Sequence, residues 1–142
     1  MIYTKQTKKA LKLCFEAHKD QLDKSGMPYV FHPFHLAEQM TDETTTVVAL
    51  LHDVVEDTDY TLADLTAMGF GEEVIAALTL LTHDPEVPYM DYVQTIKGNP
   101  VAKAVKLADL AHNSDETRLD VMDEYALRRQ EKYRQAALLL QE

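Results

Sequence analysis

The stretch TTTVVALLHDVVEDT, residues 44–58, decides how the chain folds. Its β-branched Thr and Val residues suit a strand, but the apolar run continues into HDVVED without a turn signal, and no neighbouring segment resembles a pairing strand. The pattern therefore predicts a buried helix over residues 44–57. Ionisable side chains interrupt the apolar face of this helix, and burying such groups is costly unless a partner or a bound metal compensates them.

The segments on either side of this stretch also have helical spacing. Apolar residues recur three and four positions apart, and Pro, Gly and capping residues mark the ends of most segments. We expect an all-α fold of about seven to eight helices, in a single domain that spans residues 1–142. The expected helices cover approximately residues 4–20, 33–40, 44–57, 61–69, 72–81, 89–97, 101–113 and 123–140.

The composition restricts the classes of function. The chain has 142 residues and a net charge of −10, which disfavours nucleic-acid binding because phosphates require a basic surface. No apolar run approaches the roughly 18 residues of a membrane helix, and no secretory signal is visible, so we expect a cytoplasmic protein. Cys14 is the single cysteine, and its apolar neighbours predict a buried structural thiol.

The polar residues of the 44–57 segment have the chemistry of a metal site. On a helix, residues three and four apart share a face, so Glu56 would lie beside His52 and Asp53. Imidazole and carboxylate groups suit first-row divalent metals, but two adjacent ligands are too few. The candidates elsewhere are His32, which precedes Pro33, and Asp109 in KLADLAHN, residues 106–113.

Each of these two candidates also has an ordinary structural explanation. His32 could simply mark the entry to a helix, and Asp109 could belong to a solvated helix face. The other histidines have no paired partner in the sequence, and we expect structural roles for them: His18, His35, His83 and His112.

The order His32, His52–Asp53 and Asp109 resembles the H…HD…D set of the HD superfamily of metal-dependent phosphohydrolases, which are all-helical. The likeness extends to three longer segments that are similar to motifs of the Rel/Spo-type alarmone hydrolases. They are AHKDQLDKSGMPYVFHP (17–33), LLHDVVEDTDYTLADL (50–65) and VKLADLAHN (105–113). At this length the chain resembles the stand-alone small alarmone hydrolases, and the resemblance implies an HD-domain helical bundle.

The resemblance also implies a set of roles. It implies Mn²⁺, or another divalent metal, held by His32, His52, Asp53 and Asp109. It implies that Glu56 and Asp57 assist the attacking water, and that the nucleotide is contacted by Lys24, Ser25 and Asn113. In this family the reaction removes the 3′-pyrophosphate from ppGpp.

Two positions depart from the family's pattern. Asp23 stands where alarmone hydrolases commonly carry an Arg that stacks on guanine, and Leu110 replaces another Arg. Three functions therefore stay open: hydrolysis of (p)ppGpp, hydrolysis of a different nucleotide by a related HD enzyme, and a non-catalytic metal-bound sensor or partner-binding module. The pair Glu56 and Asp57 favours an enzyme. We expect a small nucleotide as the partner, with no nucleic acid and no membrane, and the sequence favours no oligomeric state.

Overall fold

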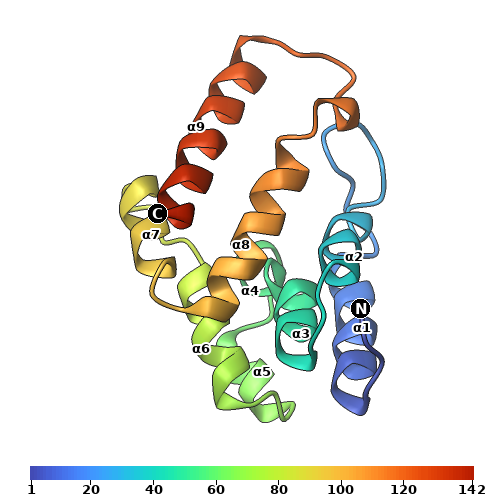
Figure 1. Ribbon diagram of the computed structural model, residues 1–142. Helices are drawn as coiled ribbons and strands as arrows, with labels where there is room; N and C mark the ends of the chain where they lie inside the picture. Colours follow the sequence, from blue (N-terminus) through green and yellow to red (C-terminus); the bar gives the residue numbers. More distant parts are fainter.

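The computed structural model describes all 142 residues and is built from helices without a sheet, as the sequence predicts (Figure 1). The elements, in chain order, are α1 (Lys5–His18), α2 (Phe31–Glu38), α3 (Glu43–Leu51), α4 (Val54–Asp57), α5 (Leu62–Ala67), α6 (Glu72–Leu81), α7 (Tyr89–Ile96), α8 (Pro100–Asn113), the 3₁₀ turn η1 (Glu116–Arg118) and α9 (Glu124–Gln141).

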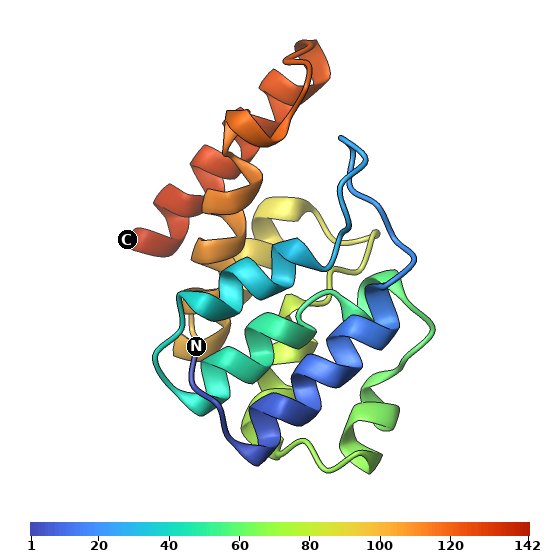
Figure 2. The same ribbon diagram turned by 90° about the vertical axis from the view of Figure 1, so that its right-hand side faces the viewer.

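Helix α3 forms the centre of the molecule. It packs against α1, α2, α6 and α8, and all of its residues from Thr45 to Leu51 are buried. Figure 2 shows α1, α2 and α3 side by side, with α8 and α9 extending away from them. The apolar character of α3 on every side is explained by this position, because a helix enclosed by others has no solvent face.

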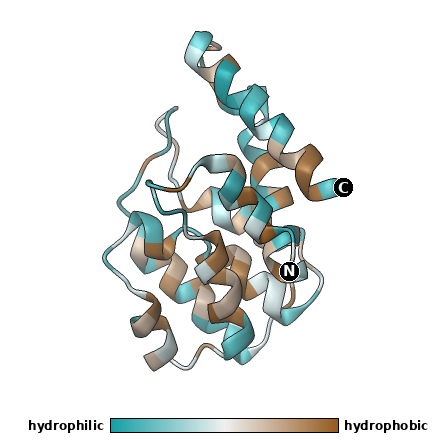
Figure 3. Cartoon of the chain, turned by 90° about the vertical axis from the view of Figure 1, so that its left-hand side faces the viewer, coloured by the Kyte–Doolittle hydropathy of each residue, from teal (hydrophilic) through white to brown (hydrophobic).

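The surrounding helices bury one face each. Figure 3 shows brown, apolar segments concentrated in the central helices, whereas most of α9 is teal except near its C-terminal end. At that end Ala136 and Leu140 are fully buried, and α9 packs against α7 and α8. None of the helices combines the length and apolar character needed to cross a membrane.

Local sequence signals set the helix ends. The hydroxyl of Thr61 accepts a hydrogen bond from the amide of Asp64, and the Asp64 carboxylate accepts one from the amide of Thr61, which forms a capping box. After α5, Gly69 adopts a φ of 92°, a conformation that glycine adopts without a steric cost. Both ends of this helix agree with the sequence prediction.

The prediction of one continuous helix over residues 44–57 is wrong. The helix ends at Leu51, and a short helix, α4, begins at Val54. Nδ1 of His52 donates a hydrogen bond of 2.6 Å to the carbonyl of Ala49, which a continuing helix would offer to the amide of Asp53. Asp53 has φ −107° and ψ 1°, outside the helical range, so its side chain leaves the helix at a new angle.

The expectation for Cys14 is confirmed. Its side chain is 1% exposed within α1, and burial raises the pKa of the thiol to about 12. The thiol therefore stays protonated and unreactive at neutral pH.

Candidate metal centre

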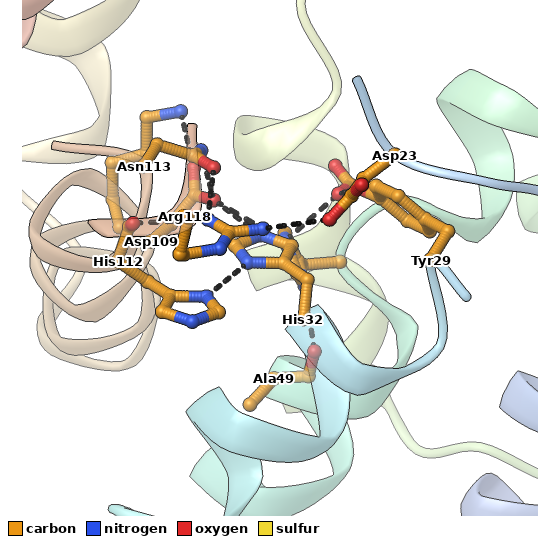
Figure 4. A network of polar contacts seen from close by, with 11 residues as sticks. Asp23, Tyr29, His32, Ala49, Asp109, His112, Asn113 and Arg118 are labelled. Atoms are coloured by element: carbon orange, nitrogen blue, oxygen red, sulfur yellow. Dashed lines mark hydrogen bonds and ion pairs between the residues drawn. The ribbon is translucent and has the colours of Figure 1, made fainter. Parts of the chain in front are cut away.

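Three helices bring His32, His52 and Asp109 to one buried point. His32 lies in the first turn of α2, His52 directly follows α3, and Asp109 belongs to α8. One ligand atom from each residue lies within 4.8 Å of the others, and all three residues are buried. Figure 4 shows two members of this cluster, His32 from α2 and Asp109 from α8, facing each other.

The ring of His52 is held by a hydrogen bond at Nδ1. Because its Nδ1 donates to the Ala49 carbonyl, Nε2 is left unprotonated in the neutral ring. Nε2 is buried and lacks an aligned hydrogen bond, although it lies 3.0 Å from Asp53 Oδ2 and 3.5 Å from Asp109 Oδ1. Burial disfavours the imidazolium, but the charges of Asp53 and Asp109 outweigh burial and raise the pKa of His52.

The ring of His32 is held from both sides. Its Nε2 lies 2.8 Å from Asp109 Oδ1, and its Nδ1 lies 2.7 Å from Nδ1 of His112. Burial and the charge of Arg118 lower the pKa of His112 to about 4, so His112 is neutral at physiological pH. A neutral His112 can accept the Nδ1 proton of His32, which frees Nε2 of His32 for a metal.

Asp53 has a partner that orients its carboxylate. The hydroxyl of Tyr29 donates a short hydrogen bond to Asp53 Oδ2, the same oxygen that lies near His52. Burial raises the pKa of the Tyr29 phenol, and the charge of Asp53 raises it further, so Tyr29 stays protonated and can only donate to this carboxylate. Tyr29 thereby fixes the direction in which Asp53 presents its oxygens.

The Asp109 carboxylate has more hydrogen-bond and ion-pair partners than any other group of the cluster. Lys106 Nζ donates to Oδ2 at 2.9 Å, and Asn113 Nδ2 donates to Oδ1 at 2.9 Å. Burial alone would raise the pKa of Asp109, but Lys106, His32 and His52 lower it well below its usual range. Asp109 is therefore ionised at every physiological pH, as a metal ligand must be.

The donor set fits a divalent cation. The two imidazole nitrogens and the Asp109 carboxylate that the structure brings together are ligands of the kind that Mn²⁺, Fe²⁺ and Zn²⁺ accept. The fourth predicted ligand, Asp53, lies outside this group of three, although its Oδ2 is 3.0 Å from Nε2 of His52. Nε2 of His52 is buried without an aligned hydrogen bond and faces the carboxylates of Asp53 and Asp109, an arrangement that a cation bound among these groups would satisfy.

Glu56 lies beside this cluster. Together with His52, Asp53 and Asp109 it lines a small cavity of about 20 Å³, which is close to the space of one water molecule. Oε1 of Glu56 accepts a hydrogen bond of 2.7 Å from the main-chain amide of His83. Partial burial raises the pKa of Glu56, and the charge of Asp53 adds to this.

Asp57 is placed differently from Glu56. Its carboxylate is not part of the cavity lining, and its main-chain carbonyl accepts a hydrogen bond of 3.0 Å from Gln21 Nε2. Partial burial, followed by the charge of Asp53, raises the pKa of Asp57. The structure thus places Glu56, but not Asp57, in the small cavity with the cluster.

The residues expected to bind a nucleotide share a second pocket. It has a volume of about 230 Å³, and Lys24, Ser25 and Asn113 all line it. Tyr29 and Asn113 belong both to this pocket and to the partners of Asp53 and Asp109. The pocket therefore adjoins the histidine and aspartate cluster.

The two positions that depart from the family's pattern have different surroundings. Asp23 lines the second pocket, and its Oδ1 accepts hydrogen bonds from the amides of Ser25 at 2.9 Å and Met27 at 3.0 Å. Leu110 is 1% exposed in the hydrophobic core and does not line this pocket. Only Asp23 can thus contact a ligand there.

Three residues of the site were missed by the sequence analysis as members of it: Tyr29, Lys106 and His112. Lys106 precedes Asp109 by three residues on one helix, so helical spacing was a signal for it. Tyr29 lies before α2 and its partner Asp53 belongs to a different segment, so spacing along the sequence does not reveal that contact. His112 gives no such signal, because its partner His32 lies on a different helix.

Comparisons with known proteins agree with this geometry. A family model described as "HD domain" matches residues 10–83. The chain is 40% identical over 114 residues to guanosine-3′,5′-bis(diphosphate) 3′-pyrophosphohydrolase MESH1 of Mus musculus, covering 70% of this chain and 63% of that protein. It is 36% identical over 122 residues to a GTP pyrophosphokinase of Streptomyces coelicolor, covering 77% of this chain and 14% of that protein.

A solved structure has the same fold. It is described as a metazoan orthologue of SpoT that hydrolyses ppGpp, and it superposes with a TM-score of 0.77 at 25% identity, covering 99% of this chain and 85% of the other. The chain spans less than two thirds of the length of the mouse and Streptomyces relatives. The family match covers more than half of the 142 residues and includes His32, His52 and Asp53. The chain therefore belongs to the HD domain family.

Proposed function

We propose that this protein is a metal-dependent phosphohydrolase that removes the 3′-pyrophosphate from (p)ppGpp. The observation that carries the proposal is the cluster of His32, His52 and Asp109, whose ligand atoms lie within 4.8 Å of one another beside Glu56. The relatives named as 3′-pyrophosphohydrolases support the choice of substrate. The proposed ligands are His32, His52, Asp53 and Asp109, and the proposed metal is Mn²⁺.

The proposed reaction gives separate roles to the bound metal and to the side chains of Glu56 and Asp57. When bound, a divalent cation lowers the pKa of a water ligand from about 15.7 toward 7 and stabilises charge on phosphoryl oxygens. Glu56, with its raised pKa, accepts the proton of the attacking water as that water adds to phosphorus. The bond between ribose O3′ and phosphorus breaks, and O3′ takes a proton from solvent while Glu56 later returns its own proton to solvent. The products are pyrophosphate and the nucleoside 5′-diphosphate from ppGpp, or the 5′-triphosphate from pppGpp. In this proposal Asp57 assists by orienting the water from outside the small cavity.

The nucleotide is held in the adjoining pocket. We assign Lys24, Ser25 and Asn113 to substrate binding, because they line the pocket next to the proposed metal ligands. Lys24 is exposed and supplies a positive charge, which offsets the acidic background of the chain. Asn113 bonds Asp109 through Nδ2 and so links the pocket to the metal centre.

A substrate panel tests the proposal. Purified protein is incubated with Mn²⁺ and separately with ppGpp, pppGpp, ppApp, NADPH and simple nucleotides, and the release of pyrophosphate and phosphate is measured. We expect pyrophosphate release from ppGpp and pppGpp, and its loss in Asp53→Ala. Turnover of another compound without turnover of ppGpp would contradict the choice of substrate.

A second candidate is an HD phosphohydrolase that acts on a different nucleotide. Asp23 favours it, because a carboxylate lies in the pocket where alarmone hydrolases commonly have a stacking Arg. The same panel separates the two candidates. Metal binding without turnover of any compound would instead support a non-catalytic metal-bound sensor or partner-binding module.

A further inference from the structure

Arg118 projects its guanidinium into the second pocket and is held there from two directions. Its Nη1 donates to the carbonyl of His112 at 2.9 Å and to Asn113 Oδ1 at 3.2 Å. Its Nη2 lies 3.9 Å from Asp23 Oδ2, which is too long for a hydrogen bond but close enough for attraction. Figure 4 shows Arg118 between Asn113 and Asp23.

This arrangement leaves donors free on the pocket side. Nη1 uses its two protons within the chain, whereas Nη2 makes no hydrogen bond there. The side chain is 24% exposed, so the guanidinium is fixed and still accessible. A planar guanidinium held in this way is pre-organised to bind a phosphate through parallel N–H groups.

The charges of the pocket also favour an anion. Its lining contains three basic residues, Lys24, Arg118 and Arg129, against two acidic residues, Asp23 and Asp115. The pocket is thus positive within a chain whose net charge is −10. Both acidic side chains accept hydrogen bonds from within the chain. Asp23 accepts from the amides of Ser25 and Met27, and Asp115 accepts from the amide and hydroxyl of Thr117.

The pocket and the metal centre are joined by Asn113, which bonds Asp109 on one side and Arg118 on the other. A ligand that extends from one to the other would place one phosphate group at the metal and a second at Arg118. We infer that Arg118 binds the 5′-phosphates of a nucleotide that carries phosphates at both ends, and that Asp23 is a positioning residue for Arg118. This inference rests on the proposed function and names the part of the substrate that the metal centre does not hold.

Two substrates that differ only at the 5′ end test the role of Arg118. They are ppGpp and guanosine 3′-diphosphate with a free 5′-hydroxyl, both hydrolysed with Mn²⁺ present. Arg118→Ala should raise KM for ppGpp about 10- to 100-fold, as expected for a hydrogen-bonded charge pair, with kcat changed by less than about 2-fold. KM for the analogue should be the same in the wild type and in the variant.

Arg128→Ala is the matched control, because Arg128 is 73% exposed, pairs with Glu124 at 3.0 Å and does not line the pocket. It should leave both KM values unchanged. Arg118→Lys keeps the positive charge but lacks the planar guanidinium, so its KM for ppGpp should lie between those of the wild type and Arg118→Ala. If Arg118→Ala fails to fold, Arg118→Lys takes its place in the comparison. An equal rise in KM for both substrates would overturn the inference.

Asp23→Asn tests the positioning role. Asparagine keeps an oxygen that can accept from the Ser25 and Met27 amides but removes the charge that faces Arg118. Its KM for ppGpp should rise less than that of Arg118→Ala, and the double variant should be no worse than Arg118→Ala alone. Additive effects, or a rise in KM for the analogue, would contradict this role of Asp23.

Calorimetry separates the inference from the proposed hydrolysis. Guanosine 5′-diphosphate is titrated into the wild type and Arg118→Ala without added metal, with guanosine as the reference ligand. Arg118→Ala should bind the diphosphate at least about 10-fold more weakly and guanosine equally well. If the wild type hydrolyses neither substrate, the proposed function fails, whereas equal diphosphate binding by both proteins, or none by the wild type, overturns the role of Arg118.

Discussion

Replacement of Lys106 by Met tests the charge balance of the metal centre. Lys106 and Asp109 are 12% and 9% exposed, and their charges lie 2.9 Å apart. The Lys106 ammonium also lies 5.4 Å from the centre of the Tyr92 ring, so the substitution removes a cation–π interaction as well. Lys106→Met keeps much of the apolar volume and leaves Asp109 without its cationic partner.

The expected cost follows from the remaining partners of Asp109. Breaking a buried ion pair costs about 3–5 kcal/mol when the remaining charge has no other partner. Asp109 keeps its contacts to His32 and Asn113, so we expect a loss of about 2–3 kcal/mol in the free energy of unfolding. For a chain of this size that corresponds to a fall of roughly 5–10 °C in Tm.

The assay is thermal unfolding in EDTA and again in excess Mn²⁺. If Asp109 is a metal ligand, the bound cation compensates its charge, so the loss of Tm in Lys106→Met should shrink to half or less with Mn²⁺. Lys103→Met, on the same helix and without an ion pair, is the control and should change stability by less than about 0.5 kcal/mol. An equal loss with and without metal would refute the reasoning that places a cation on Asp109.

The remaining predictions concern the base and the ligands. Glu56→Gln should keep its metal, measured by elemental analysis, while kcat falls about 10²- to 10⁴-fold, and a full rate would exclude Glu56 as the base. Because burial raises the pKa of Glu56, its basic form is lost as pH falls, so the acidic limb of kcat should lie above the ordinary Glu pKa of about 4.3 and be absent in Glu56→Gln. Tyr29→Phe removes the hydroxyl that orients Asp53 and should weaken Mn²⁺ binding about 10- to 100-fold in calorimetry, and unchanged affinity would contradict that role.

The helices could be predicted from the sequence because their signals are local. Apolar spacing and caps such as Thr61 with Asp64 involve residues a few positions apart, and these signals gave the helix positions to within about two residues. The break after α3 could not be predicted, because neither Gly nor Pro marks it. The break arises where the side chain of His52 donates a hydrogen bond to the carbonyl of Ala49 and the main chain at Asp53 leaves the helical conformation.

The expected metal ligands could be identified because the order of their residue types is distinctive. Two of the groups that orient them, Tyr29 and His112, could not be identified, because their contacts join separate segments. Tyr29 reaches Asp53 from the end of the α1–α2 loop, and His112 reaches His32 from the end of α8. A single sequence records which residues are present but not which helices will face each other, so these contacts depend on the packing of α2, α3 and α8.

The division between helices and loops explains why the chemistry is easier to infer than the substrate. His32 and Asp109 lie within α2 and α8, and His52 directly follows α3, so a substitution there disturbs the core as well as the site. Asp23 and Arg118 lie in the α1–α2 loop and in η1, where a substitution changes few buried contacts. Asp23 lines the pocket and lies outside the cluster of His32, His52 and Asp109, so under the proposed function its departure from the family's pattern bears on substrate choice and not on the hydrolytic step.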